Sequence, residues 1–334
     1  MSVTGHPKVS IALATYNGET FLREQLASFL SQTRLPDELV VGDDSSRDGT
    51  RAILAEFARE APFPVRVEVN DPALGPGRNF AATIARCTGD IIFLSDQDDV
   101  WHPGKIERML EFMARHPGCL VALHDANLVD ASGTPLGQTM GGQIAASGAA
   151  PEKGLIAGCC MAFNGRLARL YDPPPATQIH DAWLTSMADA FQARAYLPEP
   201  LIDYRRHGAN VSQSYMYAAT RASRWRRIAD RVARARSRPA RDALAANVAQ
   251  QQSALDALEA HRSLLADLLP AERLRLGLDE LERKQARDRR RLAVHQAPRS
   301  ARPGLLLRGV QSGDYSGRAG LISLARDLGD VWRR

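Results

Sequence analysis

The sequence lacks any run of about 18 apolar residues, the length that a membrane-spanning helix needs. It also lacks the GxGxxG and P-loop patterns, which removes support for dinucleotide and ATP sites. Only 4 of its 334 residues are cysteines, without metal-ligand spacing, so we expect reduced thiols in a cytoplasmic protein. We expect the adjacent Cys159 and Cys160 to serve in packing. The first residues show no ordered charged, apolar and cleavage regions, so we expect no signal peptide.

Charge is divided unevenly along the chain. Residues 1–215 hold 18 Lys and Arg against 25 Asp and Glu, whereas residues 216–334 hold 25 against 13. This division predicts an acidic body that handles a metal-bound ligand and a basic region that meets an anionic surface.

The first 130 residues alternate between short apolar runs and stretches with apolar residues at helical spacing. We predict strands at residues 9–14, 39–42, 65–69, 91–94 and 120–123. We predict helices at residues 19–32, after Asp48, at 79–86 and after Pro103. This alternation predicts an α/β fold with a mainly parallel sheet and helices on both faces. Beyond Gly133 the pattern weakens, and we expect residues 140–150 to be a mobile loop.

The strand predicted at residues 91–94 ends in Ser95-Asp96-Gln97-Asp98-Asp99, which places three carboxylates within four residues. Ligands bind beyond the carboxyl ends of parallel strands, and carboxylates this close together need a counter-charge. Asp96 and Asp98 can direct oxygens at one hard cation, Mg²⁺ or Mn²⁺, which binds the oxygens of a diphosphate. A solvated acidic turn before the next helix is the alternative interpretation.

Two strands that we expect to be neighbours also end in polar residues. The first leads into Thr15-Tyr16-Asn17-Gly18 and the second into Asp43-Asp44-Ser45-Ser46. A carboxylate can accept the ring N–H of a pyrimidine, a Thr hydroxyl can meet a carbonyl, and Tyr16 can cover the ring. In the loop at residues 75–79, Arg78 is available for a phosphate at a helix N-terminus. Ordinary turns with helix capping are the alternative.

Taken together, residues 10–18, 41–50 and 93–101 resemble the family 2 glycosyltransferases, which are inverting enzymes of the GT-A fold. The last segment is most similar to members that transfer L-rhamnose. The resemblance covers about residues 8–215. It implies a GT-A nucleotide-sugar-binding and catalytic domain at residues 1–215, followed by a mostly helical region at residues 216–334.

The resemblance also implies roles for individual residues. Asp96 takes the first-carboxylate role of the DxD motif, near the ribose and the cation, and Asp98 is the direct ligand of Mn²⁺ or Mg²⁺. Arg78 stands where relatives often have Lys, and we assign it a contact to the donor. The implied contacts to the base and ribose are Thr15, Tyr16, Asn17 and Asp44, with Asp43 as the alternative to Asp44.

Sugar transfer also needs a base, across the pocket from the metal, that removes the proton of the attacking hydroxyl. The segment His180-Asp181-Ala182-Trp183 follows three prolines and resembles the family segment that holds this base. The resemblance makes Asp181 the catalytic base, and we assign His180 and Trp183 to the acceptor. Ala182 replaces an aromatic residue, which affects the shape of the acceptor pocket. A helix N-cap at Asp181 and a core position for Trp183 are the alternatives, and residues 158–164 are expected in the acceptor wall.

Residues 204–212 follow an extended segment at residues 196–202 and resemble the closing motif of the family. The resemblance implies that His207 supplies a third metal ligand and that Arg205 or Arg206 meets phosphate oxygens. An ordinary surface or core histidine is the alternative for His207.

The basic region begins with Trp225, Ile228 and Val232 at helical spacing among eight arginines between residues 221 and 238. Such a cationic amphipathic helix is typical of docking on an anionic membrane surface. A solvated helix packed on the body is the alternative. After Pro239, leucines at roughly helical spacing between residues 244 and 269 predict a helical hairpin or a dimerising coil.

We therefore expect a metal-dependent inverting glycosyltransferase that uses a nucleotide-diphospho-sugar, dTDP-rhamnose or a UDP-sugar. Its acceptor would be a glycan or a lipid-linked molecule in cell-surface polysaccharide synthesis, at the inner face of the cell membrane. A homo-oligomer is a further expectation. One alternative is a nucleic-acid-binding protein, but the basic region lacks interleaved aromatic residues, so we expect no nucleic-acid partner. Another is a nucleotide-sugar binder without catalytic activity.

Overall fold

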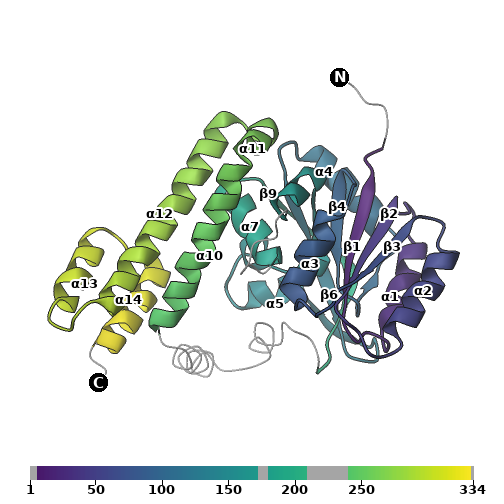
Figure 1. Cartoon of the computed structure of the whole chain (residues 1–334), viewed down its shortest axis with the longest axis horizontal. Helices are drawn as coiled ribbons and strands as arrows, with labels where there is room; N and C mark the ends of the chain where they lie inside the picture. Colours follow the sequence, from purple (N-terminus) through teal and green to yellow (C-terminus); the bar gives the residue numbers. More distant parts are fainter. Residues whose placement is uncertain (1–5, 172–179, 209–239, 332–334) are drawn as a thin grey trace. The chain divides into compact units, whose positions relative to one another are not determined.

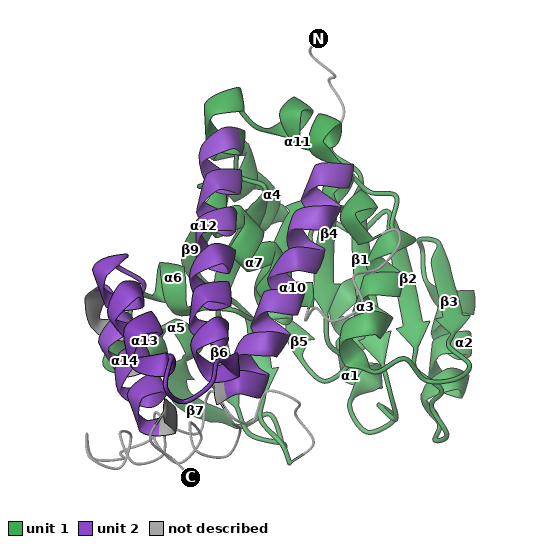
Figure 2. Ribbon diagram, turned by 60° about the vertical axis from the view of Figure 1, so that its left-hand side comes forward, with its two compact units in different colours: residues 1–219, 261–274 green, residues 220–260, 275–334 purple. Residues whose placement is uncertain are grey.

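The computed structural model of the protein describes residues 6–171, 180–208 and 240–331. The chain forms two compact units (Figure 2). One comprises Met1–Ala219 with His261–Leu274, and the other Thr220–Ala260 with Arg275–Arg334. The predicted boundary between residues 215 and 216 and the basic helix predicted at residues 221–238 lie outside the described residues.

The first unit is built on a nine-stranded mixed sheet with the order β3-β2-β1-β4-β8-β6-β9-β5, in which β7 pairs with β6 (Figure 1). Its strands are β1 (Val9–Thr15), β2 (Glu38–Asp43), β3 (Val65–Val69), β4 (Ile91–Ser95), β5 (Val100–Trp101), β6 (Val121–Val129), β7 (Pro135–Thr139), β8 (Met161–Asn164) and β9 (Arg194–Arg205). Strands β1 to β4 are mutually parallel, and β9 runs parallel to β6. The pairings of β8 with β4 and β6, of β7 with β6, and of β5 with β9 are antiparallel.

Helices lie on both faces of this sheet, as the strand–helix alternation predicts (Figure 1). They include α1 (Leu22–Leu30), α2 (Thr50–Glu60), α3 (Pro76–Ala85) and α4 (Lys105–Arg115). The α1 side chains that face inward are Leu22, Leu26 and Phe29, at the spacing of one helical face. Because β1 and β2 are covered on both sides, nearly every residue in them is buried. The predicted α/β class is confirmed.

Helix boundaries differ from the predictions by a few residues because the backbone geometry at each cap decides where a helix begins and ends. The first helix begins at Leu22 instead of residue 19. Helix α2 begins at Thr50 with Gly49 as the N-cap, but the Asp48 carboxylate accepts a hydrogen bond from the Thr50 N–H (3.0 Å). The helix therefore follows Asp48 as predicted, with Gly49 and not Asp48 at the N-cap.

Residues 140–150, which we predicted to be a mobile loop, contain helix α5 (Met140–Ala146) and are followed by the short α6 (Pro151–Gly154). The glycines of this segment have low helix propensity, so capping contacts and contacts with other elements help the helix to form. The Asp125 carboxylate accepts from the Gly141 N–H (2.7 Å), and the Thr139 hydroxyl accepts from the Gly142 N–H (3.0 Å). These two contacts satisfy the first N–H groups of the helix.

The rest of the first unit is mostly helical. A 3₁₀ turn at Gly158–Cys160 precedes β8, and a second at Gly165–Tyr171 follows it. Helix α7 (His180–Ala190) begins at the predicted residue. Helix α11 (Arg262–Leu268) buries Leu264 and Leu265.

The second unit contains the helices α10 (Ala240–Ala260), α12 (Ala271–Gln296), α13 (Arg302–Gln311) and α14 (Gly317–Val331), of which α12 begins in the first unit. Helices α10 and α12 lie side by side (Figure 2), and Gln251 Nε2 of α10 donates to Asp288 Oδ2 of α12 (2.9 Å). Helices α10 and α12 thus form a helical hairpin, and the dimerising coil stays a prediction. The fully buried Asp327 of α14 accepts from Arg291 and His295 of α12.

Across the described residues, no helix combines the length and the apolar character that crossing a membrane would require.

Candidate active site

Three adjacent strands end at one edge of the sheet, and most of the predicted site residues follow them. In the pairing register Thr15 lies opposite Asp43, and Leu13 lies opposite Ser95. The segment that begins at Asp96 therefore emerges beside the loops that follow β1 and β2. This edge holds the carboxyl ends of parallel strands, where α/β proteins bind their ligands.

Asp43 and Thr15 hold the loop after β2 from within. The fully buried Asp43 carboxylate accepts hydrogen bonds from Thr15 Oγ1 (3.0 Å), the Ser46 N–H (3.0 Å) and Arg51 Nε (3.1 Å). Thr15 is buried as well. The structure therefore brings these two predicted donor contacts together, facing one another.

Asp44 connects the same loop to the segment that leads into α3. Its carboxylate accepts from the backbone N–H groups of Leu74 (2.6 Å) and Gly75 (2.8 Å) and from Asn70 Nδ2 (3.0 Å). Gly75 has φ +83°, a conformation that favours glycine, and α3 begins at the next residue. Arg78 lies exposed in the first turn of α3. Asp44 thereby fixes the loop that carries Arg78 beside the ends of β1 and β2.

Tyr16 and Asn17 form the loop after β1. The Tyr16 side chain is 57% exposed, which leaves its ring available to cover a flat ligand. Asn17 adopts φ +47°, and its Oδ1 accepts from the Arg47 N–H (2.9 Å) while its own N–H donates to Ser46 Oγ (2.9 Å). Asn17 therefore joins the first two loops to each other.

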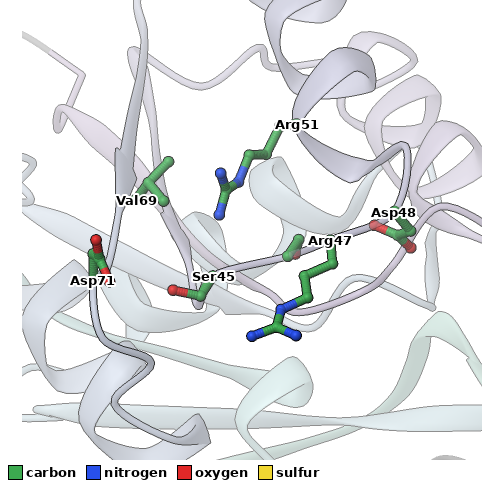
Figure 3. A pocket seen from close by; sticks show the side chains of 7 residues that line it. Ser45, Arg47, Asp48, Arg51, Val69 and Asp71 are labelled. Carbon is green, nitrogen blue, oxygen red and sulfur yellow. The ribbon is translucent and has the colours of Figure 1, made fainter.

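A pocket of about 580 Å³ opens beside these loops (Figure 3). Its lining residues come from the segment after β2, from α2 and from the end of β3, namely Ser45, Ser46, Arg47, Asp48, Arg51, Val69 and Asp71. Sequence reasoning did not single out Arg47 or Arg51. The available signal was the position of Arg47 within the motif at residues 41–50 and of Arg51 directly after it.

The acidic segment and the closing motif meet at Asp98 and His207. His207 Nε2 lies 2.7 Å from Asp98 Oδ2, although 109 residues separate them. Both side chains are mostly buried, and the Phe21 ring lies against the imidazole with 4.8 Å between ring centroids. The structure thus brings together two of the residues that we predicted to bind a metal.

The neighbouring carboxylates repel one another inside the protein. Burial, followed by the charges of Asp98 and Asp181, raises the pKa of Asp96 to about 7. Burial, followed by the charges of Asp98 and Asp96, raises the pKa of Asp99 well above its ordinary value. Burial lowers the pKa of the nearby Lys105 ammonium group to about 8. The cluster is therefore short of positive charge at neutral pH, which favours a cation.

Cys159 lies beneath this cluster. Its Sγ and carboxylate oxygens of Asp96 and Asp99 all lie within 4.8 Å of one another. Lys105 Nζ donates to the Cys159 carbonyl oxygen (2.7 Å). The predicted burial of Cys159 is confirmed, but its position against two carboxylates depends on the turn before β8, which sequence reasoning did not identify.

Arg205 lies inside the protein at the end of β9. Its side chain donates to the carbonyl oxygens of Asp98 (3.0 Å) and Ala131 (3.0 Å) and to the carboxylate of Glu24. Arg206 is half-buried. The predicted phosphate contact of either arginine stays a prediction.

Asp181 lies in the first turn of α7 and is partly exposed. Its Oδ1 accepts from the Ala182 N–H (2.7 Å). Its charge contributes to the raised pKa of Asp96, so the two carboxylates lie within electrostatic reach of each other. The charge of Asp181, on α7, therefore affects the protonation of Asp96 in the acidic segment that follows β4.

The two predicted acceptor residues lie in the interior. The His180 ring stacks on Phe80 with 3.9 Å between ring centroids, and burial lowers the pKa of His180 to about 4. Trp183 is also buried. Direct contact of either residue with an acceptor stays a prediction, and their packing fixes the start of α7.

Comparison with known proteins finds a family whose model matches part of this chain. Residues 10–167 match the model described as Glycosyl transferase family 2. An uncharacterized protein of Mycobacterium tuberculosis is 28% identical over 62% of this chain. The matched part spans 61% of the length of that protein. The putative teichuronic acid biosynthesis glycosyltransferase TuaG of Bacillus subtilis is 29% identical over 64% of this chain and 84% of its own. The dTDP-rhamnosyl transferase RfbG of Shigella flexneri is 36% identical over 30% of this chain and 36% of its own.

Among solved structures, S. aureus TarS in complex with UDP-GlcNAc shares the fold. It has a TM-score of 0.53 and 16% sequence identity over 97% of this chain and 89% of that chain. The comparisons therefore relate residues 10–167 of this chain to glycosyltransferase family 2.

Proposed function

We propose that this protein is a metal-dependent, inverting glycosyltransferase that takes its sugar from a nucleotide-diphospho-sugar. The observation that carries the proposal is the approach of His207 Nε2 to Asp98 Oδ2 (2.7 Å), beside Asp96 and within reach of the charge of Asp181. These groups come from segments far apart in the sequence. Such convergence of perturbed acids and an imidazole at strand ends is typical of an active site.

The side chains fit a divalent cation. Carboxylate oxygens suit Mg²⁺ and Mn²⁺, and the imidazole nitrogen is a further ligand that Mn²⁺ accepts. Asp98, Asp96 and His207 would hold the ion, whose charge would offset the burial and the like charges of Asp98 and Asp181 that raise the pKa of Asp96. When bound, the ion supplies neutralisation of the charge that develops on the departing diphosphate.

The donor would lie across the ends of β1, β2 and β4. Tyr16 covers the base, while Arg78 approaches the phosphates from the start of α3. Asp44, the residue whose bonds fix the loop before α3, orients this side of the site. The remaining proposed donor contacts are Thr15, Asn17, Asp96 and Arg205, with Asp43 as the alternative to Asp44.

Asp181 is the proposed base. Its Oδ1 accepts from the Ala182 N–H, which leaves Oδ2 to take the proton of the acceptor hydroxyl. The hydroxyl oxygen forms its bond to the anomeric carbon as the bond from that carbon to the diphosphate breaks, which inverts the configuration. His180 and Trp183 support this side of the site from α7.

The proposed donor is dTDP-L-rhamnose, with a UDP-sugar as the alternative. Likeness to RfbG, a dTDP-rhamnosyl transferase, supports rhamnose, and the UDP-GlcNAc complex of TarS supports the alternative. The proposed acceptor is a glycan or a lipid-linked molecule of the cell surface, which the name of TuaG supports. We further propose that the basic region, residues 216–334, docks on the anionic inner face of the cell membrane.

Calorimetry with dTDP-rhamnose, UDP-GlcNAc and a GDP-sugar, each with and without Mn²⁺, tests this function. We expect one donor to bind at least about tenfold more tightly with Mn²⁺, and to bind Asp98→Ala equally with and without the ion. Transfer of the sugar to a membrane extract should follow the same preference. If no nucleotide-sugar binds under any condition, the proposed function is wrong.

A further inference from the structure

Gln97, the residue between the two metal-binding aspartates, reaches across to the loop after β1. Its Oε1 accepts from the Tyr16 N–H (2.8 Å), and its Nε2 donates to the Tyr16 carbonyl oxygen (3.0 Å). A primary amide offers one donor and one acceptor in the arrangement that a neighbouring strand would offer. The side chain of Gln97 therefore extends the pairing of β1 with β4 beyond the end of both strands.

Gly18 leaves the room that this amide occupies. A Cβ atom added at Gly18 would meet the Gln97 amide group, with its Cδ at 2.6 Å. Gly18 does not have a positive φ, so the requirement for glycine here is one of space and not of backbone conformation. The Gly18 N–H donates to Thr50 Oγ1 (2.8 Å), which holds this residue in place.

The amide lies between the two parts of the site that the donor must touch together. Tyr16, whose ring is exposed, has its backbone fixed by Gln97. Asp98, which follows Gln97 directly, is held against His207. A shift of Gln97 therefore changes the separation between the Tyr16 ring and the Asp98 carboxylate.

We infer that Gln97 is a positioning residue that couples donor binding at the loop after β1 to cation binding at Asp98. The inference rests on the proposed function, and it adds a role for the central residue of the Asp-Gln-Asp segment. Because coupling is reciprocal, the cation strengthens binding of the nucleoside diphosphate and the nucleoside diphosphate strengthens binding of the cation by the same factor. Loss of the amide should reduce that factor in both directions.

The test compares Gln97→Met, Gln97→Ala and Gly18→Ala with wild-type protein. Methionine has nearly the length of glutamine but makes neither hydrogen bond. We expect the affinity for dTDP or UDP in the presence of Mn²⁺ to fall by about tenfold, which is what two neutral hydrogen bonds support. The affinity for the nucleotide without Mn²⁺ should change much less. Gln138→Met, at an exposed position of β7, is the matched control.

The double variant Gly18→Ala/Gln97→Ala provides a second, independent measurement. The new methyl group at position 18 would displace the amide, so Gly18→Ala should resemble Gln97→Ala. In the double variant the methyl group has no amide to displace, so its loss of affinity should equal that of one single variant and not the product of both. Losses that multiply would show that Gly18 and Gln97 act separately, which would overturn the coupling.

Hydrogen exchange at the Tyr16 amide gives a measurement that does not depend on the proposed function. Exchange at this amide should be faster in Gln97→Met, with thermal unfolding unchanged. Unaltered exchange, unaltered Mn²⁺-dependent affinity, or unfolding of both Gln97→Met and Gly18→Ala would each overturn the inference. If wild-type protein binds no nucleotide at all, the proposed function fails, while the exchange result still reports on the contact between Gln97 and Tyr16.

Discussion

Arg205 Nε donates a hydrogen bond to the backbone carbonyl oxygen of Asp98 (3.0 Å), and the Arg205 N–H donates to Asp99 Oδ1 (3.1 Å). Arg205, at the end of β9, thus holds Asp98 and Asp99 of the acidic segment in place. The side chain is only 3% exposed, and its guanidinium group lies over the Phe21 ring at 4.9 Å. These contacts favour a role in which Arg205 fixes the orientation of Asp98.

Arg205→Lys should therefore destabilise the protein and weaken the binding of Mn²⁺. A lysine has no planar fork and cannot donate to Asp98, Ala131 and Glu24 together. We expect a loss of about 1–3 kcal/mol in the free energy of unfolding, measured by urea denaturation. Arg23→Lys is the control, because its ion pair with Glu56 is largely exposed and should contribute much less to stability. Equal losses in both variants would contradict this role of Arg205.

Asp98→Asn and His207→Gln should both weaken Mn²⁺ binding. Each change removes one ligand of the proposed ion and leaves a side chain of similar size. We expect losses at least as large as the roughly 10–100-fold that changes next to metal ligands cause. Calorimetry with Mn²⁺ alone measures the loss, with His116→Gln as the control because His116 is exposed at the end of α4. Unchanged affinity in His207→Gln would limit the proposed ligands to carboxylates.

Local patterns predicted the first half of the sheet well. Strand β3 has the predicted bounds, Val65–Val69, and β1, β2 and β4 differ from the predictions by at most one residue at either end. Strands β1, β2 and β4 are buried apolar runs between helices, so their signal lies within a few neighbouring residues. The two-residue β5 and the exposed β7 have no such signal, because pairing with β9 and β6 defines them.

The candidate site shows the same difference between features that neighbouring residues determine and contacts between residues far apart in the sequence. The acidic segment at residues 96–99 was evident because it directly follows an apolar strand. The 2.7 Å approach of His207 to Asp98 was expected only through the family resemblance, because no local pattern connects residues so far apart. The interior positions of Arg205 and His180 escaped prediction because charge or an imidazole usually indicates a surface or a ligand. Their burial depends on Glu24 and Phe80, which lie on helices elsewhere in the chain.

Cation binding should depend on pH through Asp96. Burial and the charges of Asp98 and Asp181 raise the pKa of Asp96 to about 7, and a cation binds the deprotonated carboxylate. We therefore expect the affinity for Mn²⁺ to rise with pH up to about 7 and to level off above that value. Titrations between about pH 5.5 and 8 check this, and a flat profile would contradict it.

The stability of the cation-free protein should change in the opposite direction. An aspartate in the unfolded chain has a pKa of about 3.9, so the folded protein binds more protons between about pH 4 and 7. The stability that protonated Asp96 contributes is therefore lost as pH rises through this window. Urea denaturation at about pH 5 and 8 should show a larger loss for the wild type than for Asp96→Asn. Parallel losses would show that other groups cause the dependence.

The proposed membrane docking gives a prediction for exposed leucines of the second unit. Leu307 on α13 and Leu321 on α14 are 59% and 64% exposed. Exposed leucines on a basic region suit insertion among anionic lipids. Leu307→Ser/Leu321→Ser should keep the unfolding temperature and move the protein from vesicles containing anionic lipid to the supernatant. Leu136→Ser, an exposed position on β7, should leave sedimentation unchanged, and equal sedimentation of both variants would count against docking through these residues.

Asp181→Asn should abolish most of the turnover while the donor still binds. An amide cannot take the proton of the acceptor hydroxyl, and general base catalysis contributes about 10²–10⁴-fold. The nucleotide contacts are unaffected, so kcat should fall by this factor while the donor affinity stays within about twofold. Asp189→Asn on the same helix α7 is the control, because Asp189 pairs with Arg194. Near-normal turnover in Asp181→Asn would assign the base to another residue. Equal losses in both variants would point to the packing of α7 instead of proton transfer.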